Sequence, residues 1–227
     1  MDISAISLKA LLSHYKTKRE MTNFFIDGLI RHFESLAVTY LVAGNSQTFS
    51  SAPTVEGNNH EEADSLMVHC IKRLATESSD VVVYSNDTDV SVLLISHSEM
   101  LRCHSIVVVW AEDEVLDILS IAAHLGPRKS RALLSFHAIT GCDTVEKFHG
   151  KGKESWMGVF KNLGSPDIEA LISFPTAITA DVVCAVEKIL CKAYLPKTSK
   201  ITELKDARWF KFRLLMIFQN CRPPEVL

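Results

Sequence analysis

Two aspartates follow a short apolar run, where their carboxylates could hold a metal ion. Residues 81–84 are Val-Val-Val-Tyr, which predicts a buried strand, and Asp87 and Asp89 come next, at the start of a predicted helix. Two carboxylates that share one cavity repel each other, and a divalent cation removes that cost. The alternative is helix capping, with Asn86 or Asp87 as the N-cap residue and Asp89 at the positive end of the helix dipole.

Acidic residues also mark two other segment ends. Glu61, Glu62 and Asp64 stand at the first turn of a predicted helix, beyond a polar loop that follows a predicted strand. Asp143 lies where an apolar helix is expected to end. Because ligands of parallel sheets collect beyond the carboxyl ends of the strands, we expect these acids to converge. Carboxylate oxygens are hard ligands, which suit Mg²⁺ or Mn²⁺ better than zinc.

A segment rich in glycine and lysine, FHGKGKES, lies further along the chain. Gly150 and Gly152 would let a phosphate approach the backbone, and Lys151 and Lys153 would add positive charge. The segment is not a Walker A loop, because the spacing is wrong, no strand precedes it, and Glu154 stands where Ser or Thr is required. The alternative is a turn between two helices that carries lysines on its surface.

We interpret the histidines and the large aromatic residues as structural rather than functional. The spacing of the histidines is irregular, and His69 and His137 lie in apolar helices, which favours packed or surface histidines over metal ligands or acid–base groups. Helix packing is likewise preferred to base stacking for Trp156, Trp209 and Phe210.

Hydrophobic periodicity predicts alternating helices and strands, followed by helices alone. In the first half, helices are expected at 5–16, 20–36, 61–76 and 88–96, strands at 37–44, 81–84 and 106–110, and a loop at 45–59. The remaining helices are expected at 112–125, 127–138, 154–163, 167–173, 179–194 and 202–218. This order indicates an α/β protein with a parallel sheet and helices on its faces.

Three motifs, in order along the chain, resemble those of a known nuclease family. EEADS, SNDTDV and LLSFHAITGCDTVEKFHGKGKESWMGVF are similar to the acidic motifs and the helix-two-turn-helix segment of flap endonuclease-like nucleases, in the PIN-domain superfamily. The resemblance is closer still to animal proteins, often associated with mobile elements, that carry TGCDT followed by GKGK. It implies a three-layer α/β/α PIN-like domain with a central, mainly parallel sheet. The expected domains are a PIN-like core at 1–125, a helix-two-turn-helix segment at 126–165 and a C-terminal helical extension at 166–227.

The resemblance also implies an activity and the residues that carry it. The activity is structure-selective hydrolysis of phosphodiester bonds with one or two Mg²⁺ or Mn²⁺ ions, and the implied partner is nucleic acid, DNA in particular. The catalytic and metal-binding residues carried over are Glu62, Asp64, Asp87, Asp89 and Asp143. The nucleic-acid-binding residues carried over are Gly150, Lys151, Gly152 and Lys153, where a monovalent cation is implied as well.

The sequence departs from the family pattern at the first strand. Family nucleases begin with a strand that ends in an aspartate, with another aspartate further on, whereas only about twenty residues precede the first long helix here. Asp27 mimics such a strand end, but its neighbours keep a helical period. We therefore expect weak cleavage or none, and the alternative function is a PIN-like module that binds nucleic acid or protein without cutting.

The composition is typical of an intracellular protein, and we expect a nuclear one. The net charge of −3 argues against general coating of nucleic acid, but residues 192–213 carry seven basic and two acidic side chains, a net +5 that could face phosphates or simply solvent. The six cysteines form no CxxC pair, which indicates a reducing compartment and argues against a zinc site. Neither a signal peptide nor a membrane-spanning apolar run is expected.

Overall fold

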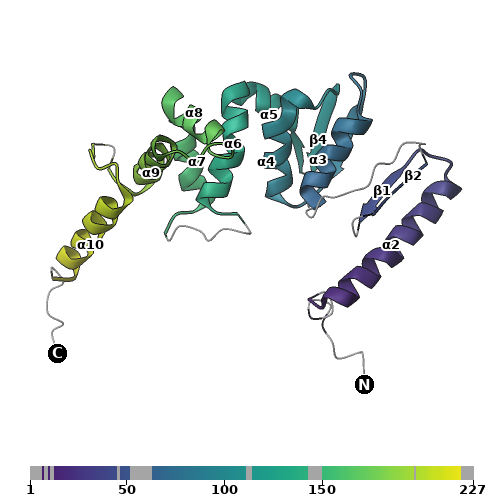
Figure 1. Ribbon diagram of the computed structural model, residues 1–227, viewed down its shortest axis with the longest axis horizontal. Coiled ribbons are helices and arrows are strands. Elements are labelled where there is room, and N and C mark those ends of the chain that lie inside the picture. The colour runs from purple at the N-terminus through teal and green to yellow at the C-terminus, as the bar shows by residue number, and fades with distance from the viewer. Residues whose placement is uncertain are drawn as a thin grey trace. The chain divides into compact units, whose positions relative to one another are not determined.

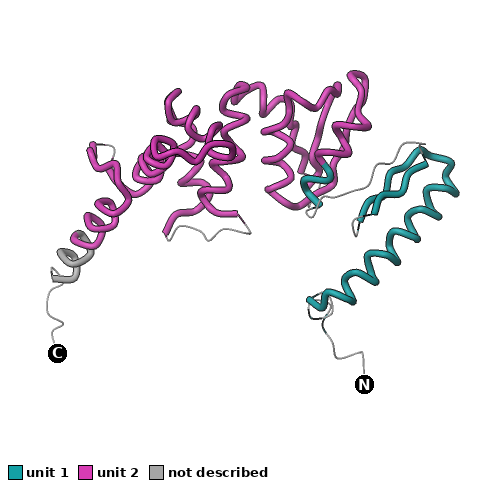
Figure 2. Tube along the Cα trace, in the orientation of Figure 1, with its two compact units in different colours: residues 1–67 teal, residues 68–227 magenta. Residues whose placement is uncertain are grey.

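The computed structural model describes residues 7, 10, 13–44, 47–51, 63–110, 114–142, 150–196 and 198–220, with side chains as far as Arg213. This part of the chain is α/β, mostly helical, with two small sheets (Figure 1). The chain divides into two compact units, residues 1–67 and residues 68–227 (Figure 2). None of the described helices has both the length and the apolar composition that crossing a membrane requires.

The first unit consists mainly of a long helix and a hairpin. Helix α2 (Tyr15–Ser35) contacts strand β1 (Leu41–Gly44), which pairs antiparallel with strand β2 (Gln47–Ser50). The buried side chain of Ile26 on α2 lies so close to Gly44 that a Cβ atom there would be only 3.0 Å from its Cδ1 atom. Glycine at this position therefore lets helix and strand approach each other.

Two sequence predictions in this unit are revised by the structure. Residues 47–50 were expected within a loop, and that prediction is wrong, because they form β2. Gly44 pairs with Gln47, so the two antiparallel strands form a hairpin rather than flanking a long loop. The predicted helix at 20–36 begins earlier, at Tyr15, and most of the predicted helix at 5–16 lies outside the described residues.

The second unit contains a three-stranded mixed sheet in the order β3-β4-β5. Strands β3 (Asp80–Tyr84) and β4 (Ser105–Val109) are parallel, as predicted, and β5 (Val115–Asp117) is antiparallel to β4. Helix was expected at β5, and that prediction is wrong. Three residues are too few to show a strand period, and the strand depends on pairing with β4.

Helices make up the rest of the second unit, close to their predicted positions. Their bounds are α3 Ala63–Leu74, which spans the boundary between the units, α4 Thr88–His97, η2 Ser98–Met100, α5 Ile118–Leu125, α6 Pro127–Thr140, α7 Lys153–Lys161, α8 Ser165–Ser173, α9 Ala180–Tyr194 and α10 Leu204–Asn220. Helix α5 contacts β4, and α4 contacts both α5 and α6. Helix α8 contacts α6 and α9, and α9 contacts α7 and α10.

The core of the second unit lies on one face of the sheet and extends through the helices. Val83, Ile106 and Val108 alternate with their strand neighbours and are buried, whereas Val82 and Tyr84 on the opposite face of β3 are exposed. Helix α4 is buried around most of its circumference, with six of its ten residues inaccessible. The core continues through α6 and α7, where the rings of Phe136 and the fully buried Phe160 lie 4.8 Å apart.

Candidate functional site

The two aspartates of the SNDTDV motif lie between the carboxyl end of β3 and the start of α4. The Asp87 amide donates to the Ser85 hydroxyl at 3.1 Å, and Asp87 is the N-cap residue of α4. Its Oδ1 atom accepts a hydrogen bond of 2.9 Å from the Asp89 amide. The capping interpretation of the sequence is therefore confirmed for Asp87, and Asp89 stands in the first turn of the helix.

A histidine from α6 holds the second carboxylate. The Nε2 atom of His137 lies 2.8 Å from Oδ1 of Asp89, with the two side chains 14% and 28% exposed. Because an ionised carboxylate only accepts hydrogen bonds, Nε2 must carry the proton. This contact was not predicted from the sequence, in which His137 is interpreted as a packed or surface residue. A signal was present, since His137 is four residues after the buried Leu133 and so shares its face of α6.

Each carboxylate thus has one oxygen engaged and one available. Oδ1 of Asp87 caps the helix, and Oδ1 of Asp89 meets His137. Among the described residues, no hydrogen bond or ion pair is found for either Oδ2 atom. Fixing one oxygen restricts the rotation of the side chain, so the free oxygen is held in a defined direction, as metal-binding carboxylates require.

A lysine lines the same depression as the two aspartates. The depression is open, has a volume of about 510 Å³, and is lined by Ser85, Asn86, Asp87, Thr88, Asp89 and Lys153. The Nζ atom of Lys153, the first residue of α7, lies 3.4 Å from the Thr88 hydroxyl. In the described part of the chain it forms no ion pair with either aspartate. The depression therefore presents both acidic oxygens and an ammonium group.

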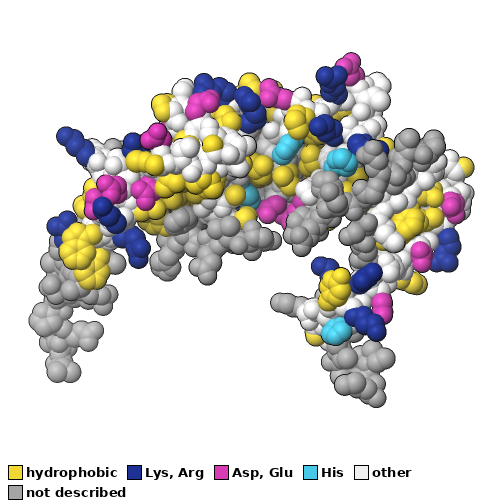
Figure 3. Space-filling view, in the orientation of Figure 1, with side chains coloured by type: hydrophobic (Ala, Val, Ile, Leu, Met, Phe, Trp, Pro, Cys, Tyr) yellow, Lys and Arg dark blue, Asp and Glu magenta, His cyan; other side chains and the backbone are white. Residues whose placement is uncertain are grey.

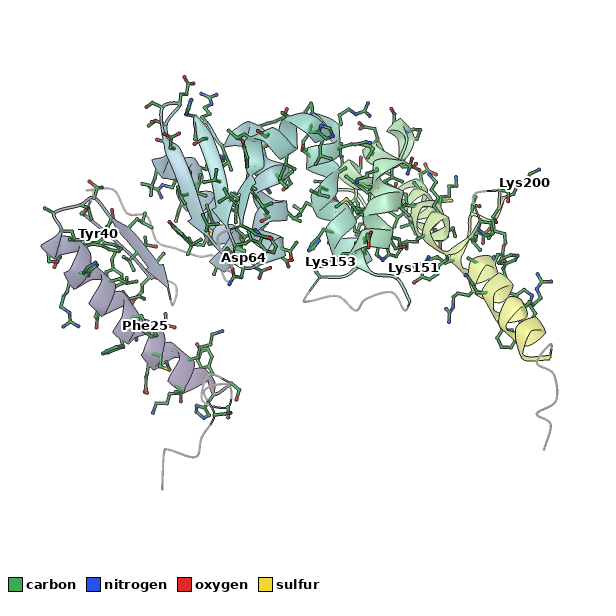
Figure 4. All side chains as sticks on the ribbon, turned by 180° about the vertical axis from the view of Figure 1, so that it is seen from behind. Phe25, Tyr40, Asp64, Lys151, Lys153 and Lys200 are labelled. Atoms are coloured by element: carbon green, nitrogen blue, oxygen red, sulfur yellow. The ribbon has the colours of Figure 1, made fainter. Side chains whose placement is uncertain are left out.

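The GKGK segment leads into α7 beside this depression. Gly150 has a φ of +72°, which favours glycine, and Gly152 is the N-cap residue of α7. A Cβ atom at either glycine would meet no described atom within 4 Å, so within this part of the structure there is space for a ligand to approach the backbone. Lys151 lies over the ring of Tyr194, 5.5 Å from its centroid, and Figure 4 labels it together with Lys153.

Of the acidic residues predicted for the site, Asp87 and Asp89 are the two found among the described residues that line the depression. Asp64 lies in the first turn of α3, in the first unit, and is labelled in Figure 4. Glu61, Glu62 and Asp143 lie outside the described residues. Within the residues that the structure describes, no group of three or more potential metal ligands is found.

A different carboxylate marks the opposite end of β3. Oδ1 of Asp80 accepts hydrogen bonds from the Ser105 hydroxyl at 2.6 Å and from Nδ1 of His104 at 2.8 Å. These bonds, with that from Ser105 the stronger influence, hold the pKa of Asp80 below its ordinary value. Asp80 thus fastens the start of β3 to β4 and is separate from the depression.

Comparisons with known proteins give no family assignment. No protein-family model matches the chain, and no curated protein and no solved structure matches it either.

Proposed function

We propose that this chain is a divalent-metal-dependent, structure-selective nuclease of the flap endonuclease-like type, acting on DNA in the nucleus. The observation that carries the proposal is one open depression lined by two carboxylates and a lysine, beyond the carboxyl end of a parallel strand. We infer further that the fold is PIN-like and that α6 and α7 are the two helices of a helix-two-turn-helix segment.

The residues of the depression fit a hard divalent cation. Asp87 and Asp89 each keep one carboxylate oxygen without a partner in the described structure, and oxygen ligands of this kind suit Mg²⁺ or Mn²⁺. Glu62, Asp64 and Asp143 are proposed to complete the set. When bound, such an ion lowers the pKa of water and offsets negative charge on the phosphate.

The protein's own groups would orient the ligands and the substrate. The helix cap fixes Asp87 and the His137 imidazole fixes Asp89, so neither carboxylate must reorganise when a cation or a phosphate approaches. Lys153 at the rim would attract the phosphodiester, and Gly150 and Gly152 would let the backbone amides at the start of α7 approach the next phosphate. A monovalent cation at this turn is part of the same proposal.

A second candidate function is a PIN-like module that binds nucleic acid or a protein without cutting. One observation favours it: both carboxylates have structural roles of their own, as a helix cap and as the partner of His137. Each of these structural roles is a reason for an aspartate to be kept at its position even in a protein that does not catalyse hydrolysis.

The nuclease is tested by incubating the full chain with 5′-flap and single-stranded DNA in Mg²⁺ or Mn²⁺. The combined Asp87→Asn and Asp89→Asn variant should lose cleavage. Asp27→Asn, which removes one negative charge from the exposed surface of α2, should retain it. Binding without cleavage by the unmodified chain would refute the nuclease and support the second candidate.

A further inference from the structure

The outward side of α10 carries two large aromatic rings that the core does not use. At 100° per residue, Leu204, Ala207 and Phe210 lie on one side of the helix, where they pack against α9. Trp209 and Phe212 lie on the opposite side and are 56% and 50% exposed. Trp209 was expected in a packed position, and that prediction is wrong.

These two rings stack on each other, and a cation lies over one of them. Their centroids are 5.6 Å apart and their planes differ by only 20°. The Arg213 guanidinium lies over the Trp209 ring, 5.8 Å from its centroid. Because each ring is still about half exposed, the stacked pair offers ring surface to a further planar group, such as a nucleobase.

The charge around Trp209 and Phe212 is positive. Between Leu204 and Arg213 the helix carries four basic residues and one acidic residue. Lys205 is 2.8 Å from Glu203, but no ion pair is found in the described structure for Arg208 or Arg213, the two cations that flank the rings. Figure 3 shows hydrophobic and basic side chains side by side on this end of the molecule. An apolar protein surface docked here would have to desolvate these cations, whereas a nucleic acid strand would offer phosphates to them.

We infer that the outward face of α10 binds single-stranded nucleic acid, with bases stacked on the exposed surfaces of Trp209 and Phe212 and phosphates at Arg208 and Arg213, which flank the two rings. Base faces are accessible only when the strand is unpaired, so a duplex of equal length binds more weakly here. This surface is distinct from the depression at Asp87 and Asp89, and its binding does not require a metal ion.

The experiment is a fluorescence-anisotropy titration of the full chain with a labelled oligothymidylate of about fifteen nucleotides. Since stacking contributes about 1–3 kcal/mol per base, Trp209→Ala should weaken binding by at least about fivefold. Trp209→Phe, which retains a ring, should keep most of the affinity. Arg208→Gln should lower the salt dependence by about one unit of slope.

A matched control is available on α2. Phe24 and Phe25 are also exposed neighbours, but their rings meet edge to face at 68°. Replacing both with Ala removes a comparable aromatic area and should change the affinity for oligothymidylate by less than about twofold, because an edge-to-face pair gives a base no parallel ring stack to extend. Far-UV circular dichroism should be the same for all variants, since every substituted side chain is exposed.

The outcomes separate this inference from the proposed nuclease. Oligothymidylate affinity that is equal in Trp209→Ala and the unmodified chain would overturn the inference, whatever the cleavage assay gives. Self-association that Trp209→Ala removes, measured by sedimentation velocity, would overturn it in favour of an interface between copies. Strand binding through Trp209 by a chain that cuts no substrate would support the inference while refuting the nuclease.

Discussion

The carboxylate of Asp87 caps α4 and is also a proposed metal ligand. Substitutions by Asn and by Ala should affect these two roles differently. Asn is as good an N-cap as Asp, since its side-chain oxygen can accept from the Asp89 amide in the same way. Asp87→Asn should therefore leave the free energy of unfolding almost unchanged in the absence of metal. Asp87→Ala loses the cap and should lower it by about 1 kcal/mol.

Metal separates Asp87→Asn from the unmodified chain, which it matches in stability when metal is absent. A ligand present at about 100 times its dissociation constant stabilises a folded protein by about 2.7 kcal/mol. If Asp87→Asn weakens Mn²⁺ binding about 100-fold, that gain falls to about 0.4 kcal/mol at the same concentration. The unmodified chain should thus be stabilised strongly by Mn²⁺, and both variants only weakly.

The assay is urea unfolding followed by tryptophan fluorescence, with and without Mn²⁺. It reports on the second unit alone, because the three tryptophans are Trp110, Trp156 and Trp209. A loss of about 1 kcal/mol should move the midpoint by roughly 0.3–1 M urea. Equal destabilisation by Asn and Ala would refute the capping account, and equal stabilisation of the unmodified chain and Asp87→Asn by Mn²⁺ would refute the ligand role.

Four further results are expected. His137→Met removes the donor to Asp89 and should weaken Mn²⁺ binding about 10-fold or more, whereas His137→Gln, which keeps a donor, should restore much of the affinity. The affinity is measured from the electron paramagnetic resonance signal of free Mn²⁺, and equal affinities in all three proteins would contradict the positioning role. Phe160→Ala should cost about 3–5 kcal/mol in urea unfolding, because the ring is fully buried against Phe136, and a cost below 1 kcal/mol would be inconsistent with that packing. Gly44→Val should destabilise the first unit by about 1–3 kcal/mol through overlap with Ile26, which limited proteolysis between α2 and β2 would detect as faster cleavage. Because the pKa of Asp80 is lowered in the folded state, its contribution to the free energy of unfolding is present above the unfolded-state pKa of about 3.9 and is lost as the pH falls through the lower folded-state value. Asp80→Asn should therefore reduce stability at pH 7 and make stability depend less on pH in the acid range. An unchanged dependence on acid pH would count against the bonds to Ser105 and His104.

Elements whose signal is local could be predicted from the sequence, and elements that depend on a partner strand could not. The strand at 81–84, the helix that follows it and the capping role of Asp87 are all local, because each depends on residues within a few positions. Strands β2 and β5 depend on pairing with a partner strand, which their own residues do not encode.

The candidate site shows the same division. The contact between Asp89 and His137 joins residues 48 positions apart, so only the packing of α6 against α4 creates it. Trp209 is a different case, because the spacing of Leu204, Ala207 and Phe210 already assigns the inner side of α10 and leaves Trp209 outside it. The helical period therefore already indicated that Trp209 faces outward. The prediction instead followed the usual preference of tryptophan for packed positions.

The burial of α4 has a consequence for how long the depression persists as the protein fluctuates. Sites on loops open and close with local motions, but the residues that follow Asp89 are almost all enclosed by neighbouring helices. The amide hydrogens of α4 should therefore exchange with solvent only when the whole second unit opens. Asp87 and Asp89 would then keep their geometry for as long as the unit is folded. Any regulation of binding in this depression would have to come from the molecule that enters it rather than from fraying of α4.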